Sequence, residues 1–185
     1  MTPVGVREVA YDVDGWGRGT LWFADGLLVW HELPAPGADT TSFGAPQPTT
    51  HCEPIVKIRT NVRPHRADSV TIDQQVLGRL ARYFAGDRVR FDDVPVDLDW
   101  CTDFQRSVAE TLRAVPYGEV VTYGELAALA GHPNAQRAAG TFCAHNRLPL
   151  VLPCHRVVAS GGLGSYGSLG TVFKRRLLEL EGVRL

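Results

Sequence analysis

Two apolar-rich stretches separated by turn residues open the chain. Residues 4–11 and 20–31 are rich in Val, Trp, Phe and Leu, and glycines and aspartates cluster at 12–19 and 25–26. Apolar runs of this length, bounded by Gly and Asp, are typical of β-strands joined by turns. The pattern therefore predicts antiparallel strands in the N-terminal part.

A proline-rich segment follows these strands. Residues 34–64 contain six prolines and many Thr, Ser and Gly residues, which predicts a long loop with one short strand at 55–58. Three histidines fall in or beside this loop: His31, His51 and His65. Because none has a second ligand at metal-binding spacing, we expect them to be solvated loop side chains.

The spacing of apolar residues becomes helical over residues 73–85. The apolar face of this predicted helix consists of Val76, Leu77, Leu80 and Phe84. Gly86 is placed to end the helix. Residues 92–103 then carry five aspartates and Pro95, and such a charged, extended run predicts a solvated linker between the two halves of the chain.

The second half of the chain is dense in helix signals. Helical spacing predicts a helix over 104–115, ended by the Pro-Tyr-Gly sequence that follows it. Thr122 and Glu125 form a capping box of the T-x-x-E type, so a short helix begins at Thr122. A Gly-His-Pro turn at 131–133 places a proline near the start of a third helix, over 134–145.

This third helix is unusual for its small residues. Arg137 stands alone among Ala135, Ala138, Ala139, Gly140 and Ala144. Two short helices joined by a tight turn are typical of a helix-turn-helix. A face of Ala and Gly has no long side chains to read bases in a major groove, but it fits against a backbone or in a narrow groove. The alternative is that the small residues only permit helix packing.

The stretch from 148 to 166 combines an apolar run with reactive groups. Residues 148–152 have the length and composition of a buried strand, which stops at Pro153. Cys154, His155 and Arg156 follow, and then a glycine-rich loop that lets a flat ligand approach the backbone. This layout fits a nucleophile with a binding loop, but a cysteine at the end of an apolar strand is also typical of an inert buried thiol.

Composition and charge add limited constraints. The chain has 185 residues, of which 44% are hydrophobic, enough for a substantial core. The net charge is −1, which by itself argues against a nucleic-acid partner. The charge is unevenly placed, however: residues 1–100 carry 10 basic and 14 acidic side chains, whereas residues 101–185 carry 9 basic and 6 acidic ones. The positive second half is compatible with a polyanionic partner, although such an asymmetry also arises by chance.

The sequence contains no membrane or cofactor signal. No apolar run is long enough to span a bilayer, and the first five residues lack the regions of a signal peptide, so we expect a soluble, cytoplasmic protein. The four cysteines show no C-x-x-C pair or zinc-ligand spacing, and the glycines at 15–19 lack the register of a dinucleotide-binding loop. We expect reduced thiols, no metal and no cofactor.

Several ordered motifs in the second half resemble the O6-alkylguanine-DNA alkyltransferases (methylated-DNA–protein-cysteine methyltransferases). Residues 151–158, Val-Leu-Pro-Cys-His-Arg-Val-Val, closely resemble the P-C-H-R-V signature of this family. Residues 123–127 look like its tyrosine-bearing first helix, and residues 136–140 look like its recognition helix. Further matches follow in order: Asn146, residues 164–166 and residues 177–182. The resemblance is strong over 104–182 and weak over 73–99.

The resemblance implies a fold, a reaction and a partner. The fold is α/β, with an N-terminal antiparallel-sheet, ribonuclease-H-like scaffold domain at 1–99 and an α-rich, winged-helix-like DNA-binding domain at 100–185. The reaction is DNA repair by stoichiometric transfer of the alkyl group from O6-alkylguanine in duplex DNA to Cys154, which inactivates the protein. Activity on O4-alkylthymine stays open. We expect a monomer.

The resemblance also assigns the catalytic residues. Cys154 is the nucleophile, which must react as a thiolate. We expect no direct contact between His155 and Cys154, because neighbouring side chains of an extended strand point to opposite sides. In the family the histidine acts through a water and a glutamate orients it, so the resemblance assigns these roles to His155 and Glu181. Tyr123 donates a proton or hydrogen bond to the leaving guanine. Arg156 ties the cysteine loop to its surroundings.

DNA recognition is assigned in the same way. A base stacked inside the duplex must be rotated out before a thiol can reach it, and Arg137 fills the vacated place. The small residues then suit a helix that enters the minor groove. The other DNA contacts are assigned to Thr122, Tyr123, Ala135, Gln136 and Gly140. The substrate pocket is assigned to Asn146, Pro153, Val157, Tyr166, Gly167 and Ser168.

The sequence departs from the family pattern in two places. The loop at 166–170 lacks the usual paired glycines, so the backbone amide that faces O6 and the size of alkyl group that fits stay open. Ala144 replaces a basic residue of some relatives, which predicts weaker or more salt-sensitive DNA binding. Two other functions remain as alternatives. Cys154 argues against a damage-recognition protein that does not transfer, and the helix-turn-helix argues against a cysteine hydrolase or redox enzyme.

Overall fold

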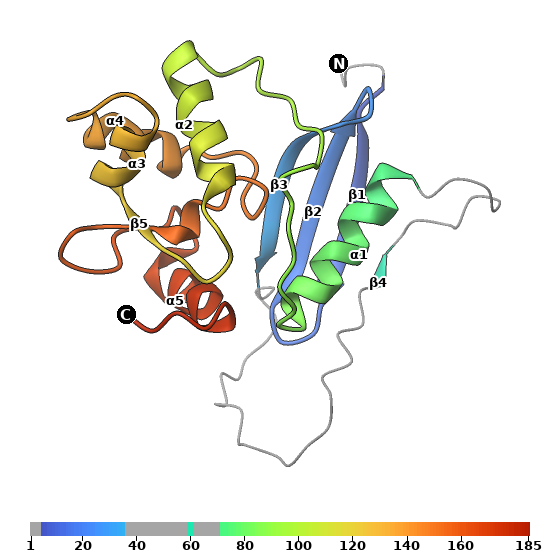
Figure 1. Ribbon diagram of the computed structural model, residues 1–185. Coiled ribbons are helices and arrows are strands. Elements are labelled where there is room, and N and C mark those ends of the chain that lie inside the picture. The colour runs from blue at the N-terminus through green and yellow to red at the C-terminus, as the bar shows by residue number, and fades with distance from the viewer. Residues whose placement is uncertain (1–4, 36–58, 61–70) are drawn as a thin grey trace.

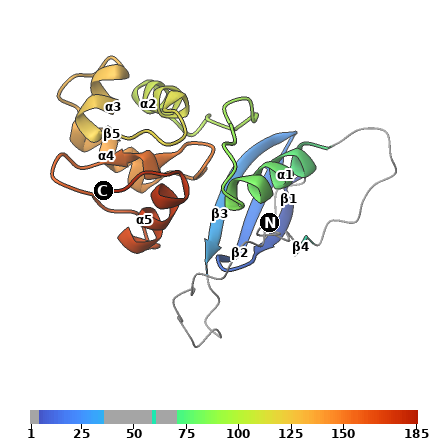
Figure 2. The ribbon, with the colours of Figure 1, turned by 60° about the horizontal axis from the view of Figure 1, so that its bottom comes forward.

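The structure is a computed structural model that describes residues 5–35, 59–60 and 71–185 (Figure 1). An antiparallel sheet with one helix across its face forms one side of the molecule. The helices of residues 103–180 gather on the other side, as both views show (Figure 2). This mixed α/β fold agrees with the coarse sequence prediction.

The sheet has the strand order β3-β2-β1-β4. Its first three strands are antiparallel neighbours, as predicted: β1 (Arg7–Val13), β2 (Gly17–Ala24) and β3 (Leu27–Ala35). They extend into the predicted turn regions, where only residues 14–16 and 25–26 remain as turns. The short strand β4 (Arg59–Thr60) pairs with β1. Because alternate side chains of β1 and β2 are buried, one face of the sheet supplies the core.

Helix α1 (Ile72–Phe84) lies across this face (Figure 1). Its predicted apolar side is buried, which confirms the assignment: Val76, Leu77, Leu80 and Phe84. Thr71 begins the helix through a capping box with Gln74. Gly86, at a φ of +94°, follows the C-cap and ends the helix as expected.

The prediction for the histidines is wrong for His31. This side chain belongs to β3, is only 3% exposed and forms hydrogen bonds with both ring nitrogens. The predicted strand at 55–58, together with His51 and His65, lies outside the described residues. Burial of His31 follows from its register on β3, which places it toward the second half of the molecule.

The predicted solvated linker is packed along its backbone. The side chains of Asp92, Asp93 and Asp99 are exposed, as expected. However, the N–H of Leu28 on β3 donates to the carbonyl oxygen of Pro95 (2.9 Å), and the backbone further along donates back to Leu28. The segment therefore extends the edge of the sheet at β3, so the prediction of a solvated linker is wrong for these residues.

The predicted helices of the second half are present. They are α2 (Asp103–Ala114), α3 (Tyr123–Leu129) and α4 (Gln136–Ala144). Thr122 caps α3 through the predicted box: its hydroxyl accepts from the Glu125 N–H, and the Glu125 carboxylate accepts from the Thr122 N–H at 2.7 Å. Helix α4 begins two residues later than predicted, because Asn134 has a φ of +72° that cannot continue a helix.

The apolar run at 148–152 is not a strand, so that prediction is wrong. The run is buried but folds as consecutive turns, and Leu150 has a φ of +69°. Pro149 and Pro153 lack the N–H groups that a strand ladder needs. Cys154–Arg156 then form a single 3-10 turn, followed by β6 (Val157–Val158), which pairs in parallel with β5 (Val121–Thr122).

Helix α5 (Gly170–Leu180) closes the second half and packs against the 3-10 turn. Its buried side carries Phe173, Lys174, Leu177 and Leu178. Within the described ranges, no helix has the length and apolar character needed to cross a membrane.

Candidate active site

Cys154 lies at the wall of a cavity of about 400 Å³ between the two halves of the molecule. Strand β3 lines one side of it with Trp30, His31, Glu32 and Leu33, and Cys143 and Ala144 of α4 line another. Of the residues assigned to the substrate pocket, Asn146, Tyr166, Gly167 and Ser168 line this cavity together with Cys154. No pattern in the sequence indicated that β3 would contribute to this cavity.

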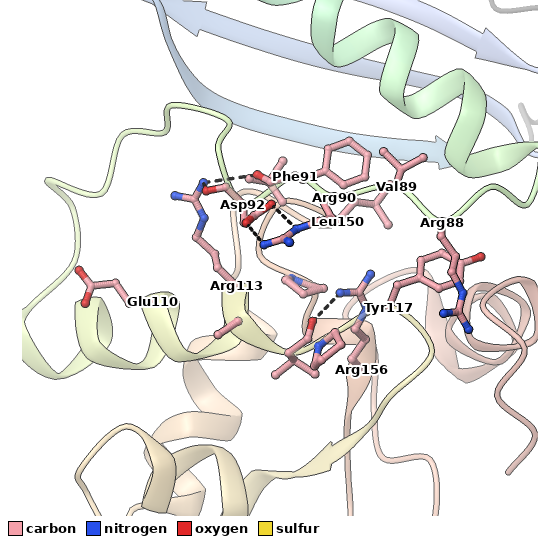
Figure 3. Close-up of a pocket in the computed structure, with 15 residues that line it drawn as sticks. Arg88, Val89, Arg90, Phe91, Asp92, Glu110, Arg113, Tyr117, Leu150 and Arg156 are labelled. Carbon is pink, nitrogen blue, oxygen red and sulfur yellow. Dashed lines mark hydrogen bonds and ion pairs between the residues drawn. The ribbon is translucent and has the colours of Figure 1, made fainter.

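The other two pocket residues lie elsewhere. Val157 is fully buried, and its carbonyl oxygen accepts a hydrogen bond from Lys174. Pro153 lines a second cavity, of about 750 Å³, behind the cysteine turn (Figure 3). Arginines that line this second cavity already form hydrogen bonds within the protein. For example, Arg113 donates to the carbonyl oxygen of Val94 at 2.8 Å. The structure therefore does not bring Pro153 and Val157 to the cavity of Cys154.

Cys154 is 6% exposed, and its sulfur accepts a hydrogen bond from a side-chain amide. The side-chain amide of Asn146 donates to Sγ at 3.0 Å and to the carbonyl oxygen of Leu152 at 2.7 Å. Burial raises the pKa of the thiol, and the hydrogen bond from Asn146 and the nearby Lys174 ammonium oppose this rise only in part. The thiol therefore needs a base before it can act as a nucleophile.

Lys174 is a functional candidate that the sequence analysis missed. The side chain is fully buried, and its ammonium group donates to the carbonyl oxygens of Val157 (2.6 Å) and Ser165 (3.3 Å). Burial lowers the pKa of this ammonium group, whereas the two cysteines nearby raise it. A cation held this close to Cys154 favours the thiolate. Its position three residues before Leu177, on the apolar side of α5, is the signal that predicts its burial.

His155 and Glu181 are in contact, as the family resemblance implies. His155 Nε2 lies 2.8 Å from Glu181 Oε1, and both side chains are buried. Because a carboxylate only accepts hydrogen bonds, Nε2 carries the proton and donates. Nδ1 is then the unprotonated nitrogen, and it has no hydrogen-bond partner among the described residues. The imidazole is thus fixed in the form that accepts a proton at Nδ1.

Three further groups hold the Glu181 carboxylate, and the first is the backbone N–H of Gly118, which donates to Oε2 at 3.1 Å. Arg156 donates to both of its oxygens, at 2.9 and 3.0 Å, and to the carbonyl oxygen of Val115 at 2.7 Å, which confirms the expectation that Arg156 ties the cysteine turn to its surroundings. The hydroxyl of Tyr83 on α1 donates to Oε1 at 2.8 Å. Tyr83 was missed because it lies far from the cysteine in sequence, in the weakly resembling region.

Helices α3 and α4 present the residues assigned to DNA binding. Arg137 and Gln136 are exposed, and the guanidinium of Arg137 makes no ion pair within the described part of the chain. The small residues divide between two faces of α4: Ala139 is buried in the core, whereas Ala138 and Ala144 are exposed. Helix packing alone therefore does not explain them.

Tyr123 connects this surface to the cysteine. Its ring is half-buried, and burial raises the pKa of its hydroxyl. Gly140 of α4 and Gly164 of the following loop approach the ring: a Cβ at Gly164 would lie 3.3 Å from it, and one at Gly140 would lie 3.7 Å from it. The Lys174 ammonium lies 5.9 Å from the ring centre. Thr122 and Ala135 are the N-caps of α3 and α4.

No cluster of three or more His, Cys, Asp or Glu side chains that could hold a metal lies in the part of the chain that the structure describes. Cys101, Cys143 and Cys154 are free thiols there, whereas Cys52 lies outside it. Burial raises the pKa of Cys143 well above its usual range, which makes it an unreactive thiol beside the cavity.

Comparison with known proteins agrees with this geometry. The family model described as the DNA-binding domain of 6-O-methylguanine DNA methyltransferase matches residues 103–183. A methylated-DNA–protein-cysteine methyltransferase of Methanopyrus kandleri is 51% identical over 104 residues, which cover 56% of this chain and 76% of that protein. One from Mycobacterium tuberculosis is 49% identical over 107 residues, which cover 57% of this chain and 63% of that protein.

Solved structures extend the similarity to the N-terminal half. The crystal structure of Mycobacterium tuberculosis OGT in complex with DNA aligns with a TM-score of 0.64 and 32% identity, over 93% of this chain and 92% of that one. The O6-methylguanine-DNA methyltransferase of Pyrococcus kodakaraensis aligns with a TM-score of 0.59 and 24% identity, over 94% and 99% of the two chains, and shows the shared fold.

Proposed function

Because this chain belongs to the methylated-DNA–protein-cysteine methyltransferase family, we propose that it repairs duplex DNA by moving the alkyl group of O6-alkylguanine to the sulfur of Cys154, once per molecule. The observation that carries this proposal is the arrangement around the thiol. Asn146 donates to Sγ, Lys174 supplies a buried positive charge, and the neighbouring His155 presents an unprotonated nitrogen.

The first chemical step is removal of the thiol proton. We infer that this proton passes through a water to Nδ1 of His155, whose other nitrogen already donates to Glu181. The carboxylate then stabilises the imidazolium that forms, and the hydrogen bonds from Arg156 and Tyr83 keep it ionised. Asn146 and Lys174 stabilise the thiolate while it exists.

The second step is a displacement at carbon. A bond forms between Sγ of Cys154 and the alkyl carbon while the bond from that carbon to guanine O6 breaks. Negative charge develops on the leaving guanine, and the hydroxyl of Tyr123 neutralises it by donating a hydrogen bond or proton. Tyr123 suits this task because it lies at the junction of the exposed helices and the buried site.

Access to the base is assigned to α3 and α4. In this proposal α4 enters the minor groove with its exposed Ala138 and Gln136, and Arg137 occupies the place that the rotated base leaves. The solved relative that is a complex with DNA supports DNA as the partner. We assign the rotated base to the cavity of about 400 Å³ beside Cys154, and the size of alkyl group that fits and activity on O4-alkylthymine are left to experiment.

The architecture follows the same assignment. We propose that residues 100–185 form a winged-helix-like DNA-binding domain and that residues 1–99 form a ribonuclease-H-like scaffold. In this assignment the protein is a cytoplasmic monomer without a cofactor.

The test is incubation with a duplex that contains O6-methylguanine, followed by peptide mass mapping. One methyl group should appear on the peptide that carries Cys154 and on none that carries another cysteine. Cys154→Ser should abolish transfer but retain DNA binding, because Arg137 lies on a separate helix, whereas Cys143→Ser should transfer normally. Transfer by the Cys154→Ser variant would end the proposal.

A further inference from the structure

His31 joins the N-terminal sheet to the segment that precedes the cysteine turn. Its backbone N–H donates to the carbonyl oxygen of Arg147 at 2.9 Å, and its Nδ1 lies 2.8 Å from the carbonyl oxygen of Pro149. On the other side of the ring, Nε2 lies 2.6 Å from the hydroxyl of Tyr11. One residue of β3 therefore makes two hydrogen bonds to the backbone of a distant segment.

The direction of these hydrogen bonds is fixed. A carbonyl oxygen only accepts, so Nδ1 of His31 carries the proton and donates to Pro149, and Nε2 accepts from Tyr11. Gly19 lies opposite Tyr11 in the sheet and leaves room for its ring, since a Cβ there would lie 2.5 Å from it. Burial lowers the pKa of His31 to about 4, so this neutral form persists at neutral pH.

The segment that His31 holds lacks regular secondary structure, although its apolar side chains are buried and the Leu152 N–H donates to the carbonyl oxygen of Leu148 at 2.7 Å. Residues 147–153 form turns and bends without helix or strand pairing, and the two prolines within them, Pro149 and Pro153, donate no backbone hydrogen bond. The guanidinium of Arg147 lies over the rings of Trp100 (4.6 Å) and Trp30 (5.7 Å), which adds a second contact with β3. The N-terminal sheet therefore holds the start of this segment, through its contacts with Arg147 and Pro149.

Asn146, whose side chain contacts the Cys154 sulfur, directly precedes this segment. Asn146 accepts from the N–H of Leu148 at 3.0 Å while its amide nitrogen donates to Sγ of Cys154, also at 3.0 Å. A displacement of residues 147–149 would therefore move the Asn146 amide. Amide donation to sulfur favours the thiolate over the thiol, so the position of Asn146 affects both the acidity and the reactivity of Cys154.

We propose that His31 is a positioning residue for alkyl transfer, which holds residues 147–149 so that the Asn146 amide stays in contact with the Cys154 sulfur. The proposal rests on the proposed function and goes beyond it, because it gives the N-terminal sheet a part in the reactivity of the thiol. It also explains why a histidine is buried between two parts of the molecule that are distant in sequence.

The test of this role compares two substitutions of His31, of which one keeps and the other removes the hydrogen-bond donor to the carbonyl oxygen of Pro149. His31→Asn keeps an amide donor near the position of Nδ1, whereas His31→Leu removes it. At saturating duplex, the single-turnover rate constant should fall about tenfold or more in His31→Leu, since misplacement of reacting groups is costly, and stay within about threefold of the parent in His31→Asn. The Kd for duplex should stay within about twofold, because α4 is unchanged.

A second measurement is independent of DNA. The rate at which iodoacetamide alkylates Cys154 is followed against pH, with the product quantified on the Cys154 peptide. The midpoint of this pH titration should shift to higher pH in His31→Leu and in Asn146→Ala, and it should stay unchanged in His31→Asn. Val9→Ala, which removes a buried side chain of β1, should lower the unfolding temperature without moving the midpoint. If His31→Leu does not fold, His31→Gln replaces it, because its longer amide imitates Nε2 and not Nδ1.

The outcomes separate the two proposals. If the parent protein does not transfer a methyl group from DNA, the proposed function fails, but the thiol titration still decides the part played by His31. If His31→Leu or His31→Gln unfolds at lower temperature while the midpoint and the transfer rate match the parent, the contact is only structural and this inference is overturned.

Discussion

His155 and Glu181 meet 2.8 Å apart, although one lies in the turn that begins at Cys154 and the other caps the end of α5. Burial alone would raise the pKa of the carboxyl, but the hydrogen bonds from His155 and Arg156 lower it to about 2. Burial lowers the pKa of the imidazole, and Glu181 opposes this only in part. At neutral pH the pair is therefore a neutral imidazole beside an ionised carboxylate.

Glu181→Gln should impair both stability and transfer. Arg156 would be left buried without its anion, and breaking a buried ion pair on one side costs about 3–5 kcal/mol. The imidazolium that forms during the reaction would lose its counter-charge, so the rate of transfer should fall about 10²-fold. Urea unfolding and single-turnover kinetics measure the two effects.

Glu179→Gln is the matched control for this substitution. Glu179 lies two residues away on α5, and its side chain is exposed. It should unfold and react like the parent. Equal effects of the two substitutions would show that net charge near the C-terminal end of α5, and not the contact with His155, determines the result.

The pH dependence of stability should report the burial of His31. Its pKa in the folded protein is about 4, whereas the ordinary value is 6.5. Between these values the unfolded chain binds a proton that the folded chain does not, so the free energy of unfolding should fall as the pH is lowered from about 6.5 to about 4. The contribution is about 3 kcal/mol at most.

Urea unfolding of the parent and of His31→Asn at a series of pH values measures this contribution. The variant should lose less stability than the parent over this range. Below about pH 4 His31 is protonated in both the folded and the unfolded parent, so it no longer contributes to the slope. The free energies of unfolding of parent and variant should then change in parallel with pH. Curves that are parallel over the whole range would show that His31 takes up its proton equally in both states.

Local signals explain which parts of the fold could be predicted. The helix at 73–85 and the capping box at Thr122 were correct because apolar spacing and capping depend on a few neighbouring residues. The strand predicted at 148–152 was wrong because an apolar run reports burial and not conformation. There the prolines and the left-handed Leu150 decide the backbone.

The residues of the candidate site also divide into those that the sequence identified and those that only the structure shows. Cys154, His155 and Glu181 were found through a resemblance in sequence. Tyr83 and His31 act through contacts with segments far away in the chain, so no local pattern identifies them. A polar residue on an apolar helix face, as at Lys174, was a usable signal that the sequence analysis did not use.

Arg137→Ala should slow repair of duplex DNA far more than attack on a free O6-alkylguanine base. Only the duplex requires the base to be rotated out, and a side chain that fills the gap offsets part of the unstacking cost of a few kcal/mol. We expect a loss of about 10-fold or more on the duplex and less than about twofold on the free base. Single-turnover rates on the two substrates measure this.

Arg184→Ala is the control for charge in this experiment, because Arg184 is also exposed but lies outside α3 and α4. It should show no difference between the two substrates. Equal losses on duplex and free base in Arg137→Ala would show that Arg137 acts on the chemistry or on folding and not on extrusion of the base.

The last prediction concerns turnover. The product on Cys154 is a thioether, which neither His155 nor water can hydrolyse, unlike the thioester of a cysteine hydrolase. The alkyl group therefore has no further acceptor at the site. Repaired DNA should accumulate to one equivalent per protein chain and then stop, whatever the excess of substrate.

The alkylated protein provides the decisive measurement. Mass mapping should place one group on Cys154, and addition of a second damaged duplex should give no further repair. Cys154 is only 6% exposed and its sulfur accepts a hydrogen bond from Asn146, so an added methyl group should disturb this contact and the packing of the turn, at a cost of about 1–3 kcal/mol. The alkylated protein should therefore unfold at lower temperature than the parent. Repair that continues beyond one equivalent would exclude the single-use mechanism and favour a hydrolase.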